Sequence, residues 1–472
     1  MNRIAALLIF LLLMSCATEP VRPLKVVPDA AQMAWHQMEM NAFVHFSINT
    51  FTDKEWGYGD ESTSLFAPDS VDPDGWVKLF QETGFKSVIL TAKHHDGFCL
   101  WPSRFTEHSV KNSPVKTDVV KGVSDACKKY GMNFGIYLSP WDRNHAAYGT
   151  PDYLRYYRDQ LNELFSNYGP VFEMWFDGAN GGDGYYGGAR EMRRINGASY
   201  YDWPGTMEIV RSFNSSIIFF SDAGPGVRWV GNERGVAGET NWNTISPDTL
   251  FAGKAGIEQL LNSGHEDGTQ WIPAETDVSI RPGWFYHASQ DSLVKTPEQL
   301  FQIYLTSVGR GSTLLLNIPP DKHGRIHPAD EASLRGFKEI VDRTFSVDHA
   351  ANAVITGKNR GRDYDAAKVN DNNFNTYWAT NDGETSSFID LKWKEPVTVE
   401  YIMMQEPLWL GQRVKSFRVE AEVNGALKEI GSGTTIGYKR IIKLPSPVTT
   451  NSVRLSITDS KECVALSSFS VF

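Results

Sequence analysis

The strongest constraint on the fold of this 472-residue chain is a regular alternation of helical and strand-like segments between residues 72 and 220. Each helical segment carries apolar residues at helical spacing, and each strand-like segment is a short apolar run. Helices are predicted at 72–84, 118–130, 150–168 and 205–214, and strands at 85–91, 133–138, 171–176 and 216–220. Such an alternation indicates βα units and a parallel sheet, because each helix returns the chain to the same sheet edge.

The segments after this stretch favour a closed barrel over an open sheet. A helix at 297–307, a strand at 313–318 and a last helix at 331–345 complete the pattern. No glycine-rich phosphate loop follows the first strand, as an open dinucleotide-binding sheet would require. We therefore predict an α/β fold, a (β/α)8-like barrel over residues 31–346. Residues 222–292 show little helical pattern, and we interpret them as long functional loops.

The chain changes character after about residue 350. Helical periodicity disappears, and short apolar runs are separated by turn residues. Strands are predicted at 388–393, 397–405, 416–423, 438–444, 452–457 and 464–472. This pattern is typical of a small all-β sandwich, which we assign to residues 347–472.

The N-terminus has the pattern of an export signal. Asn2 and Arg3 precede an apolar run that is too short to cross a membrane permanently. The sequence Leu-Met-Ser-Cys at 13–16 resembles a bacterial lipobox, which implies cleavage before Cys16 and a lipid on its sulfur. An ordinary signal peptide with an incidental cysteine is the alternative. We expect 1–16 to be a lipoprotein signal, 17–30 a tether, and the protein to be an exported periplasmic or outer-membrane lipoprotein of a bacterium, touching membrane only through its anchor.

Charge and composition narrow the classes of partner. Lys and Arg number 46 against 56 Asp and Glu, which gives a net charge of −10. This excess of acid argues against nucleic acid as the main partner. Aromatic residues make up 12% of the chain, with 14 Trp and 18 Tyr. That content suits stacking on sugars, although a large core also absorbs aromatic side chains.

One strand-like stretch ends in a carboxylate. Because strand side chains alternate, Glu173, Trp175 and Asp177 share one side of the run at 171–177. In (β/α)8-barrel enzymes, the catalytic groups lie at the carboxyl ends of the strands. Alternatively, Asp177 only caps the turn that Gly178 begins.

Other polar and aromatic residues stand at the ends of the predicted strands. They are His45, His94, His95, Tyr137, Trp141 and Trp175. His94, His95 and Asp96 are consecutive and fan outward, so we expect no metal site. Carboxylates among aromatic and histidine side chains favour a glycosidase. Asp177 suits the nucleophile, and its partner carboxylate is left open among Glu233, Glu239, Glu266 and Glu275.

Four ordered motifs over about residues 30–345 resemble the α-L-fucosidases of glycoside hydrolase family 29. The motifs are Phe43-Val44-His45-Phe46, Lys93-His94-His95-Asp96-Gly97-Phe98, Trp175-Phe176-Asp177-Gly178 and Leu-Leu-Leu-Asn-Ile-Pro-Pro at 314–320. The resemblance implies a (β/α)8-like barrel and retaining hydrolysis of α-L-fucosides, with a fucosylated oligosaccharide as substrate.

The resemblance also implies roles for individual residues. Asp177 corresponds to the nucleophile. The fucose-binding residues it implies are His45, Glu55, Trp56, His94, His95, Tyr137 and Trp175, with Trp284 as another pocket wall. The run from Arg228 to Glu233 is similar to the branch that prefers α-1,3/1,4-linked fucose. We therefore assign Glu233 as the acid/base, with Glu239 and Glu275 in reserve.

The C-terminal part resembles a discoidin-type (factor 5/8 type C) sandwich. The run from Asp371 to Thr380 and the run from Phe388 to Leu391 carry the resemblance. It implies a domain that often binds calcium and sometimes sugars. Ser467 and Ser468 stand where an acidic residue is usual, so no cofactor is expected, and we interpret the domain as structural first and glycan-binding second.

Two alternatives remain at this point. A non-catalytic glycan-binding surface lipoprotein would keep the barrel as a scaffold. A glycosidase for a related sugar such as galactose would use the same pair of carboxylates. Release of fucose would distinguish a fucosidase from a non-catalytic scaffold. An apolar wall facing the sugar's methyl group would distinguish a fucosidase from a galactose-specific enzyme.

Overall fold

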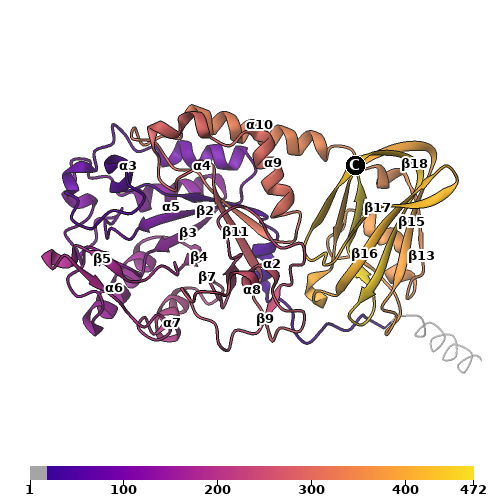
Figure 1. Cartoon of the computed structure of the whole chain (residues 1–472), viewed down its shortest axis with the longest axis horizontal. Coiled ribbons are helices and arrows are strands. Elements are labelled where there is room, and N and C mark those ends of the chain that lie inside the picture. The colour runs from indigo at the N-terminus through magenta and orange to yellow at the C-terminus, as the bar shows by residue number, and fades with distance from the viewer. Residues whose placement is uncertain (1–18) are drawn as a thin grey trace, which may run out of the picture. The chain divides into compact units, whose positions relative to one another are not determined.

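The computed structural model describes residues 19–472 (Figure 1). By their contacts these residues form two compact units, one of residues 28–346 and one that joins residues 19–27 to 347–472. The predicted signal peptide and Cys16, the predicted site of lipid attachment, lie outside the described residues. Within 19–472, no helix is both long and apolar enough to span a membrane.

The first unit is a closed barrel of eight parallel strands. The strands are β1 (Met40–Val44), β2 (Ser87–Lys93), β3 (Asn133–Leu138), β4 (Val171–Trp175), β7 (Ile218–Ser221), β8 (Val227–Trp229), β11 (Ala274–Ser279) and β12 (Thr313–Asn317). Around the barrel their order is β1, β12, β11, β8, β7, β4, β3, β2, so β1 and β2 close the ring. The predicted (β/α)8-like barrel is confirmed.

Helices accompany these strands along the chain (Figure 1). They are α2 (Ala30–His36), α3 (Ile48–Thr52), α4 (Pro73–Glu82), α5 (Val119–Tyr130), α6 (Pro151–Asn167), α7 (Trp203–Phe213), α8 (Glu258–Ser263), α9 (Pro297–Thr306) and α10 (Pro328–Thr344). Their ends follow the expected chemistry. The Asp118 side chain accepts a hydrogen bond from the Lys121 amide at the start of α5, and Gly131 ends it at φ +69°.

Two barrel strands lie where loops were predicted. Both β8 and β11 fall within residues 222–292, which carry no obvious apolar run. Strand β11 reads Ala-Glu-Thr-Asp-Val-Ser, yet every residue of it is buried. Its acidic residues lie on the inner side of the barrel, so the apolar signal of a buried strand is lost. The link at 222–226 between β7 and β8 contains no helix.

Short strands decorate the connections of the barrel. They pair as β5 (Gly182–Gly184) with β6 (Glu191–Arg193), and as β9 (Thr244–Ile245) with β10 (Gln270–Trp271). The apolar interior between the barrel strands includes Trp35, Phe43, Tyr137, Trp175, Phe220 and Leu315. Aromatic rings therefore fill much of the space beneath the carboxyl ends of the strands.

The second unit is an antiparallel sandwich. Its main sheet runs β13 (Val354–Gly357), β15 (Ser387–Gln405), β18 (Arg440–Ser460), β16 (Val414–Val423) and β17 (Ala426–Gly433), and β20 (Ser468–Val471) also pairs with β15. A small sheet joins β14 (Trp378–Ala379) to β19 (Ala465–Leu466). Two long strands replace four predicted ones: β15 covers the predicted 388–393 and 397–405, and β18 covers 438–444 in part and 452–457. The pairing of β15 with β18 continues across each predicted break through a shift in register. Strand β17 was not predicted.

Residues 19–27 pack on this sandwich, where a tether over 17–30 was expected. Val21 is buried among side chains that include Leu410 and Cys463. The Leu24 amide donates to the Leu410 carbonyl at 2.9 Å. The apolar Val21 and Leu24 explain the difference, since burying them favours docking over a free linker.

For calcium, which the discoidin resemblance implies, residues 19–472 hold no group of three or more carboxylate, histidine or cysteine side chains that could bind a metal ion. Both carboxylate oxygens of Asp371 accept from the Thr376 hydroxyl at 2.8 Å. The Lys368 ammonium lies 3.6 Å from the same carboxylate. Calcium needs six to eight oxygen ligands, several of them charged. The residues present do not fit that ion.

Candidate active site

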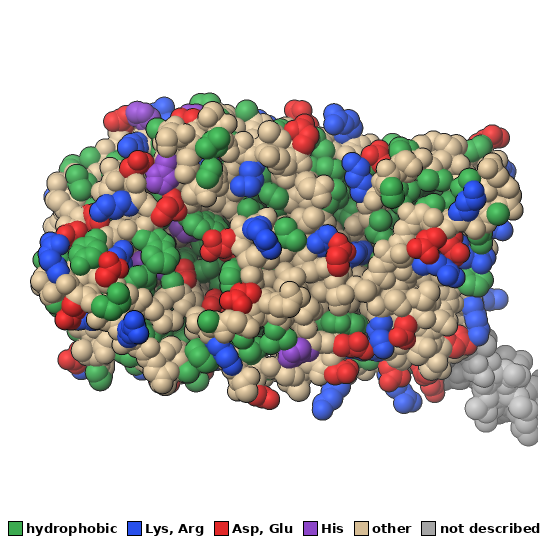
Figure 2. Space-filling model, viewed as in Figure 1, with side chains coloured by type: hydrophobic (Ala, Val, Ile, Leu, Met, Phe, Trp, Pro, Cys, Tyr) green, Lys and Arg blue, Asp and Glu red, His purple; other side chains and the backbone are tan. Residues whose placement is uncertain are grey.

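A cavity of about 480 Å³ opens at the carboxyl ends of the barrel strands. On the face seen in Figure 2, hydrophobic and acidic side chains surround a hollow in the barrel unit. Asp177, Glu233 and all the predicted fucose-binding residues line this cavity, whereas Trp141 does not. Its walls are Phe43, His45, Glu55, Trp56, His94, His95, Tyr137, Trp175, Asp177, Gly178, Ala179, Phe220, Asp222, Trp229, Glu233, Asp277 and Trp284.

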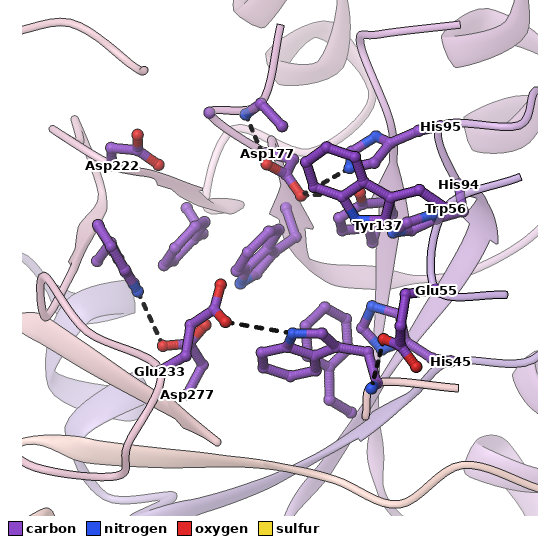
Figure 3. A pocket seen from close by; sticks show the side chains of 17 residues that line it. His45, Glu55, Trp56, His94, His95, Tyr137, Asp177, Asp222, Glu233 and Asp277 are labelled. Carbon is purple, nitrogen blue, oxygen red and sulfur yellow. Dashed lines mark hydrogen bonds and ion pairs between the residues drawn. The ribbon is translucent and has the colours of Figure 1, made fainter. Parts of the chain in front are cut away.

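Asp177 is held rigidly just beyond the end of β4. Its Oδ2 accepts from the Tyr137 hydroxyl at 2.9 Å, and its Oδ1 accepts from the Ala179 amide at 2.7 Å (Figure 3). The His95 Nε2 lies 3.9 Å from Oδ2. Fixed from two sides, the carboxylate faces the cavity in one orientation.

The tautomers of two histidines follow from their partners. The His45 Nδ1 lies 2.8 Å from the Asn317 Oδ1, which only accepts, so Nδ1 carries the proton. The His95 Nδ1 lies 2.7 Å from the Ser139 Oγ, whose own proton goes to the Trp141 carbonyl. In both rings Nε2 is therefore an acceptor, suited to a sugar hydroxyl.

Burial keeps the histidines uncharged. It lowers the pKa of His45 to about 3 and that of His95 to about 4, and it holds the pKa of His94 well below its usual value. Neutral imidazoles form hydrogen bonds with hydroxyl groups without drawing anions into the cavity. This arrangement matches an uncharged, hydroxyl-rich ligand.

Glu233 brings a second carboxyl group to the cavity. Burial raises its pKa, and the charges of Asp177 and Glu55 add to that rise, while the indole N–H of Trp284 opposes it. That N–H donates to the Glu233 Oε2 at 3.3 Å (Figure 3). A raised pKa keeps the proton on a carboxyl group to higher pH than usual, which is the direction that a general acid requires.

The reserve candidates for this role lie elsewhere. The Glu239 side chain is 64% exposed and paired with Arg310, outside the cavity. Glu275 is fully buried inside the barrel, and Glu266 is not among the lining residues. Of the four carboxylates left open by the sequence, Glu233 alone reaches the cavity.

Glu55 and Trp56 occupy the rim. The Glu55 Oε2 accepts from the Trp284 amide at 2.8 Å, and its Oε1 lies 2.6 Å from the His287 Nε2. Trp56 is 52% exposed. Its ring meets His95 edge-on, with the centroids 5.1 Å apart. An exposed indole beside the cavity is suited to stacking on a sugar ring.

Sequence reasoning missed two carboxylates of the cavity. Asp222 follows β7, and its Oδ2 accepts from the Gly253 amide at 2.7 Å. Asp277 lies in β11, where its Oδ1 accepts from the Trp229 indole at 2.9 Å. Figure 3 shows Asp277 beside Glu233 and Asp222 apart from them. The signal for Asp222 was available, because it follows a predicted strand as Asp177 does.

Comparison with known proteins agrees with this geometry. The family model for alpha-L-fucosidase matches residues 23–343, and that for the F5/8 type C domain matches residues 351–468. Alpha-L-fucosidase 1 of Arabidopsis thaliana is 36% identical over 93% of this chain and 86% of its own length.

Solved structures give the same result. A glycoside hydrolase 29 family member from an unknown rumen bacterium is 41% identical, with a TM-score of 0.85 over 96% of this chain and 78% of its own. A Ruminococcus gnavus GH29 fucosidase in complex with fucose is 31% identical, with a TM-score of 0.86 over 97% of both chains. The prediction of an enzyme is confirmed over that of a non-catalytic scaffold. The chain belongs to the α-L-fucosidases of glycoside hydrolase family 29 and carries a C-terminal F5/8 type C domain.

Proposed function

We propose that the protein is a retaining exo-α-L-fucosidase in which Asp177 is the nucleophile and Glu233 the acid/base. The observation that carries this proposal is that both carboxyl groups reach one cavity in different electrostatic settings. Asp177 is held by two hydrogen-bond donors, whereas Glu233 is buried enough for its pKa to rise. Separate environments give two carboxyl groups separate roles.

In the first step Asp177 attacks the anomeric carbon of the α-fucoside. The bond from that carbon to the leaving oxygen breaks as Glu233 gives its proton to the oxygen. A β-fucosyl ester of Asp177 and the free acceptor glycan result. The Tyr137 hydroxyl donates a hydrogen bond to the Asp177 Oδ2 at 2.9 Å, so it stabilises the carboxylate whenever Asp177 carries its negative charge.

In the second step the ionised Glu233 takes a proton from water. The water oxygen attacks the anomeric carbon and displaces Asp177 as a carboxylate. Two inversions leave α-L-fucose as the first product, and Glu233 is again protonated. Proton NMR of a fresh reaction tests this directly, since β-fucose as the first anomer would exclude the double displacement.

The walls of the cavity favour fucose over galactose. Phe43, Trp175 and Phe220 present carbon rather than hydrogen-bonding groups on part of the lining. Fucose has a methyl group where galactose has a hydroxymethyl group, and an apolar wall leaves that hydroxyl without a partner. The fucose complex of the Ruminococcus gnavus relative supports the same sugar.

For linkage, we propose α-1,3/1,4-fucosylated glycans. The run from Arg228 to Glu233, similar to the branch with that preference, supports the proposal. The test is a panel of fucosylated oligosaccharides that differ only in linkage. Release from α-1,3 and α-1,4 branches with little release from α-1,2 or α-1,6 linkages is expected, and the reverse ranking would overturn the assignment.

We also propose that the enzyme is exported and held to a membrane by lipid on Cys16. The lipobox-like sequence at 13–16 supports this proposal. The Cys16→Ser variant should leave the membrane fraction, and a Ser15→Ala variant should stay in it as the matched control. Retention of Cys16→Ser in the membrane fraction would exclude the anchor.

A further inference from the structure

Two carboxyl groups face each other inside the barrel, beneath the cavity. Glu173 on β4 and Glu275 on β11 are both buried, at 1% and 0% exposure. Neither lines the cavity. The proposed hydrolysis uses neither of them, so their retention in the barrel interior calls for another role.

A hydrogen bond connects this pair to the cavity wall. The Trp175 indole N–H donates to the Glu275 Oε1 at 2.9 Å. In the barrel order, β7 and β8 separate β4 from β11, so the bond crosses the interior rather than joining neighbouring strands. It fixes the indole of a cavity residue to the opposite side of the barrel.

The surroundings of the pair are polar but sparsely bonded. Trp35, Asn41 and Glu173 lie close enough to Glu275 to affect its pKa. Yet the Trp35 Nε1, the Asn41 amide and both Glu173 oxygens have no hydrogen-bond partner within the described residues. Within the described residues, the bond from the Trp175 indole is therefore the one hydrogen bond that the Glu275 side chain accepts.

Both carboxyl groups are weaker acids than usual, and burial raises the pKa of Glu275 to about 7. Burial, and then the nearby Glu275, raise the pKa of Glu173 well above its usual value. Two adjacent buried carboxylates repel each other, which favours a proton on one of them. Glu173 therefore keeps its proton, which leaves Glu275 to accept from the indole.

The orientation of Trp175 matters to the cavity. Its ring stacks on Phe220, with the centroids 3.8 Å apart and the planes 4° from parallel. It also lies 5.3 Å from the ring of Tyr137, whose hydroxyl donates to Asp177. A rotated indole would change the sugar wall and disturb the support of the nucleophile.

We propose that Glu275 is a positioning residue, which fixes the Trp175 indole from below through the hydrogen bond to its Oε1. This inference rests on the proposed placement of the sugar against Trp175. Glu275 itself touches no substrate, and it acts only through the indole N–H.

The test compares two substitutions at Glu275. Glu275→Gln keeps an oxygen that accepts from the indole, so kcat/KM should stay within about threefold of wild type. Glu275→Met keeps the length but offers no acceptor, so kcat/KM should fall by up to about 100-fold, as displaced positioning groups allow. Equal losses in the two variants would overturn the proposal.

A double-mutant cycle with Trp175→Phe shows whether the effect passes through the indole. Phenylalanine has no N–H, so Glu275→Met should add less than about threefold to the loss already caused by Trp175→Phe. An undiminished loss in that background would contradict the positioning role.

Glu163 provides a matched control. This buried carboxylate also accepts from an indole, that of Trp101 at 2.7 Å, but it lies on α6 away from the cavity. Glu163→Met, which likewise removes the acceptor, should leave kcat and KM unchanged at temperatures where the protein is folded. A kinetic loss as large as that of Glu275→Met would show that any buried indole acceptor has the same effect.

A spectroscopic readout separates this inference from the proposed function. In the full chain labelled with 15N-tryptophan, Trp175→Phe identifies the Trp175 indole resonance. That resonance should shift upfield in Glu275→Gln, because an amide is a weaker acceptor than a carboxylate. An unmoved resonance would overturn the Glu275 contact even if the enzyme were active. A moved resonance with unaltered kinetics in Trp175→Phe would instead refute the sugar wall.

Discussion

The two units of the molecule bury carboxyl groups in opposite ways. In the sandwich, Glu406 is 3% exposed and accepts from three backbone amides, those of Arg413, Val414 and Gly437, at 2.6–2.8 Å. In the barrel, Asp177 and Glu233 retain faces that open on the cavity. A saturated carboxylate can only support structure, whereas an unsaturated one beside a cavity is available to a ligand.

Because of this difference, removing a carboxylate should affect activity in one unit and stability in the other. Loss of the Asp177 or Glu233 carboxylate should impair activity and leave the fold intact. Loss of the sandwich carboxylate should weaken the fold and leave the chemistry intact.

The largest effect is expected at the nucleophile. Asp177→Ala should lower kcat by at least about 10⁴-fold, because no other group can form the glycosyl ester. Azide should partly restore turnover of an activated aryl fucoside and give a β-fucosyl azide. Thermal unfolding should stay close to wild type. Substantial activity without azide would place the nucleophile elsewhere, with Asp222 the next carboxylate to examine.

Glu233→Gln should cost about 10²- to 10⁴-fold on natural glycans, whose leaving oxygen needs a proton. An activated aryl fucoside should lose far less. The wild-type kcat/KM should fall as pH rises through the raised pKa of Glu233, because the acid must be protonated to act, and Glu233→Gln should lack that limb. Glu233→Ala with azide should give the α-azide. Full activity in Glu233→Ala would refute the assignment.

The sandwich carboxylate tests the other side of the comparison. Glu406→Ala leaves three buried backbone amides without a hydrogen-bond acceptor. This should lower the free energy of unfolding by roughly 3 kcal/mol. Calorimetry measures this loss, and the exposed Glu395→Ala on β15 serves as the matched control. At temperatures where the variant is folded, kcat and KM should match wild type. A change in KM instead would give the sandwich a part in substrate binding.

The smallest effect is expected at the rim. Trp56→Ala should raise KM about fivefold with kcat nearly unchanged, because an exposed ring contributes stacking alone. Phe105→Ala, also an exposed aromatic but outside the cavity, should change neither constant. A fall in kcat at Trp56→Ala would mean that this ring, which meets His95, positions the catalytic side of the cavity.

The barrel was predictable because parallel strands gather distant residues. His45, His94, Tyr137 and Asp177 are far apart in sequence, yet each stands at the carboxyl end of a strand. Once the strands were recognised, their convergence followed from topology alone. The structure brings all four to one cavity.

The two barrel strands that were predicted as loops, β8 and β11, were missed because both contain charged residues. Strand β8 carries Arg228, and β11 carries Glu275 and Asp277, so neither has an apolar run. Glu275 and Asp277 face the barrel interior and cavity, where they accept from indoles. Arg228 lies on the other side of its strand from Val227 and Trp229, and its Nε donates to the Leu261 carbonyl. In β11 the residues that face the site removed the apolar pattern, and in β8 a buried arginine outside the barrel did so.

Two other features required the structure. Glu233 lies in a loop whose path no periodicity describes, so only a motif pointed to it. Strand β17 is mostly exposed, with no buried side chain to create an alternating pattern. Sequence patterns record burial, and neither feature is defined by burial.

The most direct test of the account is to trap the covalent intermediate. The wild-type enzyme, treated with a 2-deoxy-2-fluoro fucosyl fluoride, should retain one fluorofucosyl group per chain, and peptide mass spectrometry should place it on Asp177. Asp177→Ala should take up no label. A label on Asp222, Asp277 or Glu233 in the wild-type enzyme would contradict the central claim.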